Sequence, residues 1–430
     1  MTTTAQWVGP PVGIARVERE LARRARRHLG EDVAFCLYDR SRAAVLVIDD
    51  ATADDLIEGR VRADLAPAKD LVDNARRKLR ALLLQNASAY HFFQRLRGRS
   101  FTREQIVQIQ ALEFDKTPLA KLPHYPARLD ADTRIISGGL DWQYKDLRAL
   151  WTLKQTCRFS YCAILYDLIP VRFPQFVVPG YVELLTDYFG ELLWLADQTM
   201  CISESTRRDW LRYAYEVGAK PVPSTVFPLG CDLSPVAAPG SKVELPPELQ
   251  DKRFALYVST IEPRKNHRML YEAWDECIRT KQVDPAQDRI VFVGRRGWAI
   301  GDLLREIETN PLTRDTIVLL HDVSDAQLTM LYRSCAFVLF PSLYEGFGLP
   351  LAEALSYGKL CVTTDAGALA EIGDDLVMRL DAKDTLAWSR AIGRLMPSSA
   401  ERDTWEARIR NAYRPINWDE AAQHFFNAVI

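Results

Sequence analysis

The sequence predicts an α/β protein with two doubly wound domains that face each other across a cleft. Two series of short aliphatic and β-branched runs alternate with helical patterns, and spacings of roughly 10–25 residues between runs favour parallel βαβ units. A connector rich in Pro, Gly and Ser, from Pro235 to Pro247, separates the two series. A chain of 430 residues with 48% hydrophobic content can form two such cores.

The predicted elements follow in chain order. We expect strands at 33–38, 44–48, 134–137, 163–165, 199–203 and 224–227, and then at 254–259, 290–293, 317–320, 336–340 and 360–363. A charged helical stretch, about 51–130, interrupts the first series as an insertion, and 413–430 is an amphipathic helix. The predicted organisation is therefore an N-terminal domain at 1–234, a linker at 235–252, a second domain at 253–412 and a terminal helix.

Composition excludes several classes of protein. The 55 Lys and Arg residues balance 57 Asp and Glu residues, which argues against a dedicated nucleic-acid binder. The eight cysteines are dispersed without zinc-ligand spacing, so we expect buried free thiols in a reducing compartment. There is neither a secretory leader nor a run of 18 apolar residues. We therefore expect a cytoplasmic protein that at most docks on a membrane surface.

The segment 338–358, VLFPSLYEGFGLPLAEALSYG, carries the strongest functional signal. A buried strand leads into a glycine-rich turn, and Pro350 then stands near the first position of a helix, where proline is favoured. The N-terminus of a helix offers unpaired N–H groups to an anion such as phosphate. Glu345 and Glu353 are eight residues apart, and each carboxylate can accept two hydroxyl hydrogen bonds from a sugar or a ribose.

This pattern, PSxxEGFGLPxxEA, resembles the donor-site signature of glycosyltransferase family 4. The resemblance implies the GT-B fold, in which two Rossmann-like domains face across a cleft and the C-terminal helix crosses back to the first domain. It also implies transfer of a sugar from a nucleotide diphosphate with retention of anomeric configuration. Glu345 would contact the transferred sugar and Glu353 the ribose diol. The turn and helix start would contribute donor contacts through Gly346, Phe347, Gly348 and Leu349.

Further segments resemble the same family. Arg264 and Lys265 follow a predicted strand, and the resemblance implies that this pair grips the donor diphosphate. Gly294 lies in a strand-to-glycine loop, and Val323 lies in the segment whose backbone flanks the base, although Asp325 and the residues after it also suit a plain helix start.

The N-terminal half shows weaker resemblance. Gly13 corresponds to the glycine loop that faces the donor phosphates, although the preceding residues form a poor first strand. At the end of the predicted strand 163–165, Tyr166 replaces the usual His while Asp167 remains, and we place both at the sugar or acceptor. Because an unperturbed tyrosine has a pKa of about 10, Tyr166 can supply only hydrogen bonds. The stretch 201–209 also matches the family, and we interpret it as a structural helix start capped by Ser203 or Ser205.

The predicted mechanism needs neither a cofactor nor a metal. Arg264, Lys265 and the helix start near Leu349 are fixed positive groups aimed at the departing diphosphate. The resemblance implies front-face substitution, with the leaving phosphate oxygen taking the acceptor proton. The D-x-D at Asp130 and Asp132 lies in a polar stretch without a hydrophobic strand, so we interpret it as a loop.

Acceptor and donor remain open at this point. From 74 to 103 the chain has eight Arg or Lys residues, no acid and two apolar clusters, which suits an anionic membrane surface and a lipid-linked glycan acceptor. A helical insertion packed on the domain is an equal alternative. We expect a peripheral enzyme on the cytoplasmic face of the inner membrane, with a glycan acceptor and GDP-mannose favoured over UDP-hexoses as donor. A GT-B-type epimerase or a non-catalytic nucleotide-sugar-binding subunit would share the fold.

Overall fold

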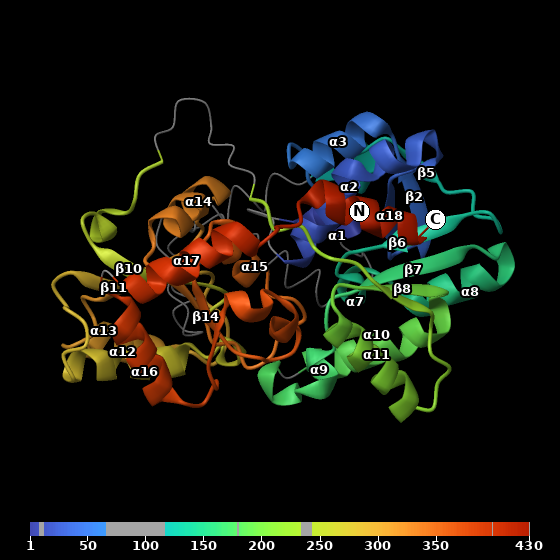
Figure 1. Cartoon of the computed structure of the whole chain (residues 1–430). Coiled ribbons are helices and arrows are strands. Elements are labelled where there is room, and N and C mark those ends of the chain that lie inside the picture. Colours follow the sequence, from blue (N-terminus) through green and yellow to red (C-terminus); the bar gives the residue numbers. More distant parts are fainter. Residues whose placement is uncertain (8–12, 66–116, 179, 234–242, 398, 430) are drawn as a thin grey trace, which may run out of the picture. The chain divides into compact units, whose positions relative to one another are not determined.

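A computed structural model describes residues 1–7, 13–65, 117–178, 180–233, 243–397 and 399–429 (Figure 1). The chain forms two compact units. The first is Met1–Ala163 with Trp194–Asp197, and the second is Ile164–Leu193 with Gln198–Ile430. Their boundary falls within strand β7, so the division at 235–252 stays a prediction. Most of the predicted insertion, including the cationic stretch 74–103, lies outside the described residues.

The first unit combines short strands with helices. Its elements are α1 (Thr2–Gln6), α2 (Ile14–Leu29), β1 (Cys36–Asp39), β2 (Ala44–Ile48), α3 (Asp50–Glu58), β3 (Ala63–Asp64), β4 (Thr117–Pro118), β5 (His124–Pro126), β6 (Arg134–Ser137), α7 (Asp141–Tyr144) and α8 (Leu147–Cys157). Helix α3 begins at an N-cap, where the Asp49 carboxylate accepts the Thr52 amide at 2.7 Å.

The first two predicted strands are not part of a parallel series. Strands β1 and β2 pair antiparallel, and β5 joins β2 antiparallel on its other side. The expectation of parallel strands is wrong here because only residues 40–43 connect β1 to β2. A parallel pair needs a crossover of about a dozen residues or more, whereas four residues suffice for a hairpin.

The remaining strands of the first series form a four-stranded sheet in the order β6-β7-β8-β9. β6 pairs with β7, and β8 with β9, in parallel, as predicted. The connecting helices alternate with the strands in βαβ fashion. The elements after β6 are β7 (Ser160–Leu165), α9 (Ile169–Arg172), α10 (Tyr181–Leu195), β8 (Gln198–Cys201), α11 (Glu204–Glu216) and β9 (Ser224–Val226).

The second series forms a six-stranded parallel sheet in the order β12-β11-β10-β13-β14-β15. Numbered from its first strand, this order is 3-2-1-4-5-6, the order of doubly wound nucleotide-binding sheets. The strand order reverses between β10 and β13. The strands are β10 (Arg253–Val258), β11 (Asp288–Val293), β12 (Ile317–Leu320), β13 (Phe337–Phe340), β14 (Cys361–Thr363) and the unpredicted β15 (Met378–Arg379).

Helices cover this sheet and close its core. Figure 1 shows α12 and α16 together beneath the strands and α14 above them. The side chains of Trp274 on α12, Trp388 on α16, and Phe292 and Phe340 on the strands are fully buried. The helices are α12 (His267–Arg279), α13 (Gly301–Thr309), α14 (Asp325–Ser334), α15 (Leu349–Ser356), α16 (Thr385–Leu395) and α17 (Ala400–Ala412).

The last helix, α18 (Trp418–Val429), returns to the strands of the first series. Asn417 and Glu420 form a reciprocal cap at its start, with bonds of 2.9 and 3.1 Å. The ring of Phe425 packs edge-on against Phe227, which follows β9, with centroids 4.9 Å apart. The crossing-back helix is therefore confirmed. Among the helices of the described ranges, none combines the length and the apolar character needed to span a bilayer.

Candidate active site

The predicted donor residues gather at one edge of the six-stranded sheet. Because all its strands are parallel, the loops that follow β10, β11, β12 and β13 leave from the same edge. In such sheets ligands bind outside the carboxyl ends of the strands, at the point where strand order reverses. That point lies between β10, which leads to Arg264 and Lys265, and β13, which leads to Glu345. The fold thus brings together residues that are 80 positions apart in the chain.

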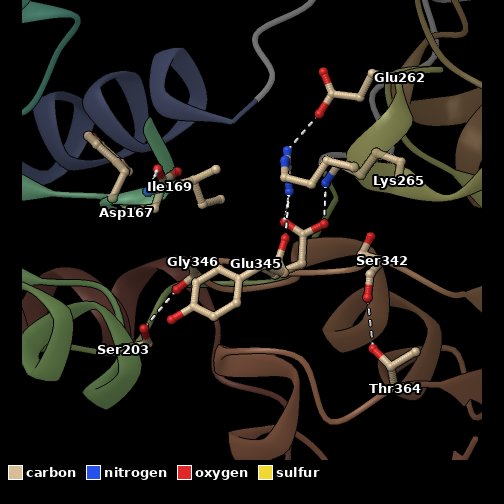
Figure 2. Close-up of polar contacts among 12 residues, drawn as sticks. Asp167, Ile169, Ser203, Glu262, Lys265, Ser342, Glu345, Gly346 and Thr364 are labelled. Carbon is tan, nitrogen blue, oxygen red and sulfur yellow. Dashed lines mark hydrogen bonds and ion pairs between the residues drawn. The ribbon is translucent and has the colours of Figure 1, made fainter. Parts of the chain in front are cut away.

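Glu345 forms ion pairs with both cations (Figure 2). Its Oε2 lies 3.0 Å from Nη1 of Arg264, and its Oε1 accepts a hydrogen bond from Nζ of Lys265. Nη2 of Arg264 donates in turn to Oε1 of Glu262 at 2.8 Å. Two cations and two carboxylates therefore form one compact cluster, which we call the switch-point cluster: Glu262, Arg264, Lys265 and Glu345.

Burial and neighbouring charges shift the ionisation of this cluster. Burial would raise the pKa of Glu345, but Lys265 and Arg264 outweigh it and lower that pKa to about 2. Burial and the like charge of Arg264 lower the pKa of Lys265. Burial opposes the charge on Arg264, but Glu345 and Glu262 raise its pKa overall. Glu345 is therefore an anion at neutral pH, and it balances charge inside the site.

Backbone contacts hold the β10 loop in place. Pro263–Lys265 form a single 3₁₀ turn that ends at Asn266, whose φ of 61° is left-handed. The hydroxyl of Tyr257 donates to the Lys265 carbonyl at 2.5 Å. The β10 loop and the β13 loop are joined by the guanidinium of Arg264, which donates to the Tyr344 carbonyl at 2.7 Å, and by the Leu343 amide, which donates to the Arg264 carbonyl at 2.9 Å. The cations are therefore fixed before any ligand arrives.

Gly348 starts helix α15 beside this cluster. Its φ is +119°, a left-handed value, and a Cβ atom there would lie 2.6 Å from Cδ2 of Leu369. Leu349 is the first residue of α15, followed by Pro350, as predicted. Within the described part of the chain, the amide of Phe347 has no hydrogen-bond acceptor. The turn therefore presents free N–H groups at a helix start, which suits an anion.

Glu353 lies inside α15 and is only 4% exposed. The hydroxyl of Tyr332 on α14 donates to its Oε2 at 2.8 Å. Burial, followed by the carboxylate of Glu353, raises the pKa of Tyr332 well above its ordinary value. The structure thus shows a partner for one carboxylate oxygen, and the assignment of Glu353 to a ribose stays a prediction.

Gly294 and Val323 occupy the loops after β11 and β12. Gly294 has a φ of +158°, and a Cβ atom there would lie 1.9 Å from the Ser259 carbonyl oxygen. Its own carbonyl accepts a hydrogen bond from Nδ1 of His321 at 2.5 Å. Val323 is half-buried just before the Ser324 cap of α14, so Asp325 does begin a helix. Gly294 is needed for the close approach of two loops, whatever it contacts in a ligand.

Tyr166 and Asp167, at the end of β7, lie against the β13 loop. A Cβ atom on Gly346 would lie 2.1 Å from the Tyr166 carbonyl oxygen and 2.8 Å from Cβ of Asp167. Oδ1 of Asp167 accepts the amide of Ile169 at 3.0 Å (Figure 2). Burial raises the pKa of Asp167, against the opposing charge of Arg264. Tyr166 and Asp167 therefore lie against the loop that carries Glu345, and their role towards a sugar or acceptor stays a prediction.

Gly13, a further predicted donor residue, lies in the first compact unit. It precedes α2 with a φ of +51°, and no atom of the described residues lies within 4 Å of an added Cβ. Its predicted contact with donor phosphates stays a prediction.

Sequence reasoning missed contacts from the start of α11. Ser203 caps this helix, as predicted, by accepting the Thr206 amide at 3.0 Å. The same hydroxyl donates to the Gly346 carbonyl at 2.7 Å, a contact that local sequence cannot reveal (Figure 2). Glu371 accepts the amides of Glu204 at 2.9 Å and Ser205 at 2.7 Å.

The D-x-D stretch lies in a turn. Oδ1 of Asp130 accepts the Thr133 hydroxyl at 2.7 Å and the Asp132 amide at 3.2 Å. Within the ranges that the structure describes, no group of three or more His, Cys, Asp or Glu side chains is arranged to hold a metal ion.

Comparison with known protein families gives a match in the second half of the chain. Residues 252–398 match the family model described as "Glycosyl transferases group 1". The O-antigen chain mannosyltransferase B of Escherichia coli is 28% identical over 272 residues, which cover 61% of this chain and 68% of that protein. The serotype-specific mannosyltransferase WbdA of Escherichia coli is 28% identical over 223 residues, 50% of this chain but only 27% of WbdA. The similarity to WbdA is therefore to about a quarter of a longer protein.

Solved structures agree on the fold. The crystal structure of Anabaena Alr3699/HepE in complex with UDP and glucose matches with a TM-score of 0.52 at 16% identity, covering 69% of this chain and 77% of that one. At this identity the match concerns the fold alone. Taken with the sheet order and the cluster at its switch point, these comparisons place residues 252–398 among the group 1 glycosyltransferases, and the chain is a glycosyltransferase with the GT-B fold.

Proposed function

We propose that this chain is a retaining, metal-independent transferase of glycosyltransferase family 4 that moves mannose from GDP-mannose to a glycan or lipid-linked glycan in surface polysaccharide synthesis. The observation that carries the donor class is the switch-point cluster, with two buried cations beside the free amides of a helix start. Two relatives are named mannosyltransferases, which favours mannose as the sugar, and one of them is named for the O-antigen chain, which favours a polysaccharide product.

In this proposal Arg264 and Lys265 bind the donor diphosphate together with the N-terminus of α15. Negative charge develops on the diphosphate as the glycosidic bond breaks, and fixed positive groups stabilise that charge without reorganisation. The same two cations replace a metal ion in neutralising the leaving group. Glu345, on the loop before α15, then binds hydroxyls of the transferred sugar.

The proposed chemistry is substitution on one face of the sugar. The bond from the anomeric carbon to the β-phosphate oxygen breaks, and its electron pair stays with the diphosphate. The acceptor hydroxyl oxygen forms the new bond on the same face, and its proton passes to the departing phosphate oxygen. Tyr166 and Asp167 adjoin the Glu345 loop, where they can orient the sugar or the acceptor.

The direct test is incubation of the purified chain with GDP-mannose and, separately, UDP-glucose. Slow release of the nucleoside diphosphate, or transfer to added glycan, supports the proposal. An isomerised donor would instead indicate an epimerase, and tight binding without turnover a non-catalytic subunit. Arg264→Met is the matched variant, because it keeps side-chain length and removes the charge. We expect it to lose donor turnover, and normal turnover would refute the role of the cation.

We also propose that residues 74–103 attach the enzyme to an anionic membrane surface, where a lipid-linked acceptor is found. Each cation near such a surface contributes about 1 kcal/mol, and salt screens the attraction. Neutralising four cations should therefore weaken binding to phosphatidylglycerol vesicles while donor affinity is unchanged. Unchanged vesicle binding would contradict the proposal. The test variant changes Arg76, Arg77, Lys78 and Arg80, and the control changes Arg394, Arg402, Arg408 and Arg410 on α16 and α17.

A further inference from the structure

One face of α11 carries buried polar side chains that the proposed chemistry does not use. Ser203, Thr206 and Asp209 are spaced three residues apart, so they share one face of the helix. They are 3%, 2% and 9% exposed. Buried polar groups cost stability unless they are hydrogen-bonded, so their partners show what they hold.

All three side chains bind segments around the switch-point cluster. The Ser203 hydroxyl donates to the Gly346 carbonyl at 2.7 Å, and the Thr206 hydroxyl donates to the Tyr166 carbonyl at 3.1 Å. The Asp209 carboxylate accepts the Tyr344 hydroxyl at 2.5 Å. Two of these partners flank Glu345 in the chain, and the third precedes Asp167. The helix therefore ties the Glu345 loop and the β7 loop to one rigid support.

The bond from Ser203 also orients a peptide group. In a trans peptide the carbonyl and the following N–H point in opposite directions. Because the Gly346 carbonyl points to Ser203, the N–H of Phe347 points away from α11, and no described residue accepts it. The loop cannot shift closer to β7, since the Tyr166 carbonyl already occupies the place of a Gly346 side chain.

We infer that Ser203 and Thr206 are positioning residues for transfer: they set the Glu345 loop against the Tyr166–Asp167 segment without touching the substrate. This inference rests on the proposed function. It implies that their hydroxyls act on turnover more than on donor binding, because Arg264 is also held by Glu262 and the Lys265 carbonyl by Tyr257, neither of which is bound by α11.

The experiment distinguishes the role of Ser203 as the N-cap of α11 from its role in positioning the Glu345 loop. Ser203→Asp keeps an excellent N-cap acceptor for α11 but cannot donate to the Gly346 carbonyl. Ser203→Thr keeps both functions. Thr206→Val keeps the backbone amide of residue 206 and the side-chain volume, but it removes the hydroxyl that donates to the Tyr166 carbonyl. Asp49→Ala removes the cap of α3 in the first unit and serves as the control for helix destabilisation alone.

For each variant, kcat for release of nucleoside diphosphate is measured with whichever of GDP-mannose or UDP-glucose the wild type turns over. Binding of the corresponding nucleoside diphosphate is measured by calorimetry, and Tm by thermal unfolding. We expect Ser203→Asp and Thr206→Val to lose roughly tenfold or more in kcat, with nucleoside diphosphate Kd within about threefold of wild type. Ser203→Thr should restore kcat to within about threefold, and Asp49→Ala should lower Tm alone.

The possible failures are distinguishable. If the wild type neither binds nor turns over either donor, the proposed function fails. If it does both, the inference fails when Ser203→Asp and Thr206→Val turn over like the wild type. It also fails when Ser203→Thr has a kcat as low as that of Ser203→Asp. A third contrary result is an Asp49→Ala variant whose kcat falls as far as the kcat of Ser203→Asp and Thr206→Val.

Discussion

Replacing Glu345 by Gln should tighten the binding of a free nucleoside diphosphate while abolishing turnover. In the protein without ligand, the Glu345 carboxylate occupies the cations that the proposed function assigns to the diphosphate. The diphosphate must therefore displace it. A neutral amide of the same shape removes this competition but can no longer bind the sugar as a carboxylate does.

The magnitude follows from the ionisation of Glu345. Its pKa lies at about 2 instead of the ordinary 4.5, and that difference corresponds to about 3 kcal/mol of favourable interaction. If all of it is lost on ligand binding, the Gln variant would bind about 100-fold more tightly. Because a displaced carboxylate keeps some contacts, we expect about tenfold.

Calorimetry with GDP and UDP measures this effect, and thermal unfolding gives a second measurement. Without ligand, the Gln variant should have a lower Tm, because Lys265 loses its carboxylate partner and Arg264 keeps only Glu262. Pyrophosphate should raise its Tm more than that of the wild type. Leu343→Met, in the same loop, is the control. A Kd that is unchanged or weaker in Glu345→Gln, with Tm unaffected by pyrophosphate, would refute the exchange of anions.

Three further predictions concern other parts of the site. Turnover should survive excess EDTA, because Arg264 and Lys265 supply the positive charge; loss of activity that Mg²⁺ restores would contradict this. Burial lowers the pKa of His267 to about 3, so the folded state resists its protonation. The free energy of unfolding is therefore highest above pH 6.5 and decreases as the pH falls towards 3, with a loss of about 2 kcal/mol at pH 5. Urea unfolding of His267→Phe at pH 7 and pH 5 should no longer show this loss. Gly346→Ala should lower both Tm and kcat, because its Cβ would meet the Tyr166 carbonyl at 2.1 Å; Gly301→Ala, whose Cβ would have no described atom within 4 Å and whose φ is not left-handed, is the control.

The sequence predicts most strands because buried parallel strands are continuous apolar runs. Strand β13 is an example, since all four of its residues are buried. Strand β15 was missed because two half-buried residues, Met378 and Arg379, form no recognisable run. The direction of β2 was wrong because the general parallel pattern was extended to a pair whose short connection allows only a hairpin.

The site was predictable where motifs are local and not where partners are distant. The cap at Ser203 depends on a residue three positions away, whereas its bond to Gly346 spans 143 positions. The pairing of Glu345 with Lys265 likewise depends on β10 and β13 being neighbours in the sheet. Strand order is a tertiary property, and a single sequence carries no direct signal for it.

The internal charge balance of the switch-point cluster has a kinetic consequence. Two carboxylates already neutralise Arg264 and Lys265, so the empty site projects little field into solution. Small anions such as inorganic phosphate would have to displace the Glu345 carboxylate from both cations, so they gain little by entering. A donor is then not drawn in from a distance by these cations, and its association rate should depend only weakly on ionic strength. We therefore expect a lower association rate constant for the donor, together with weaker binding of small anions that compete with it.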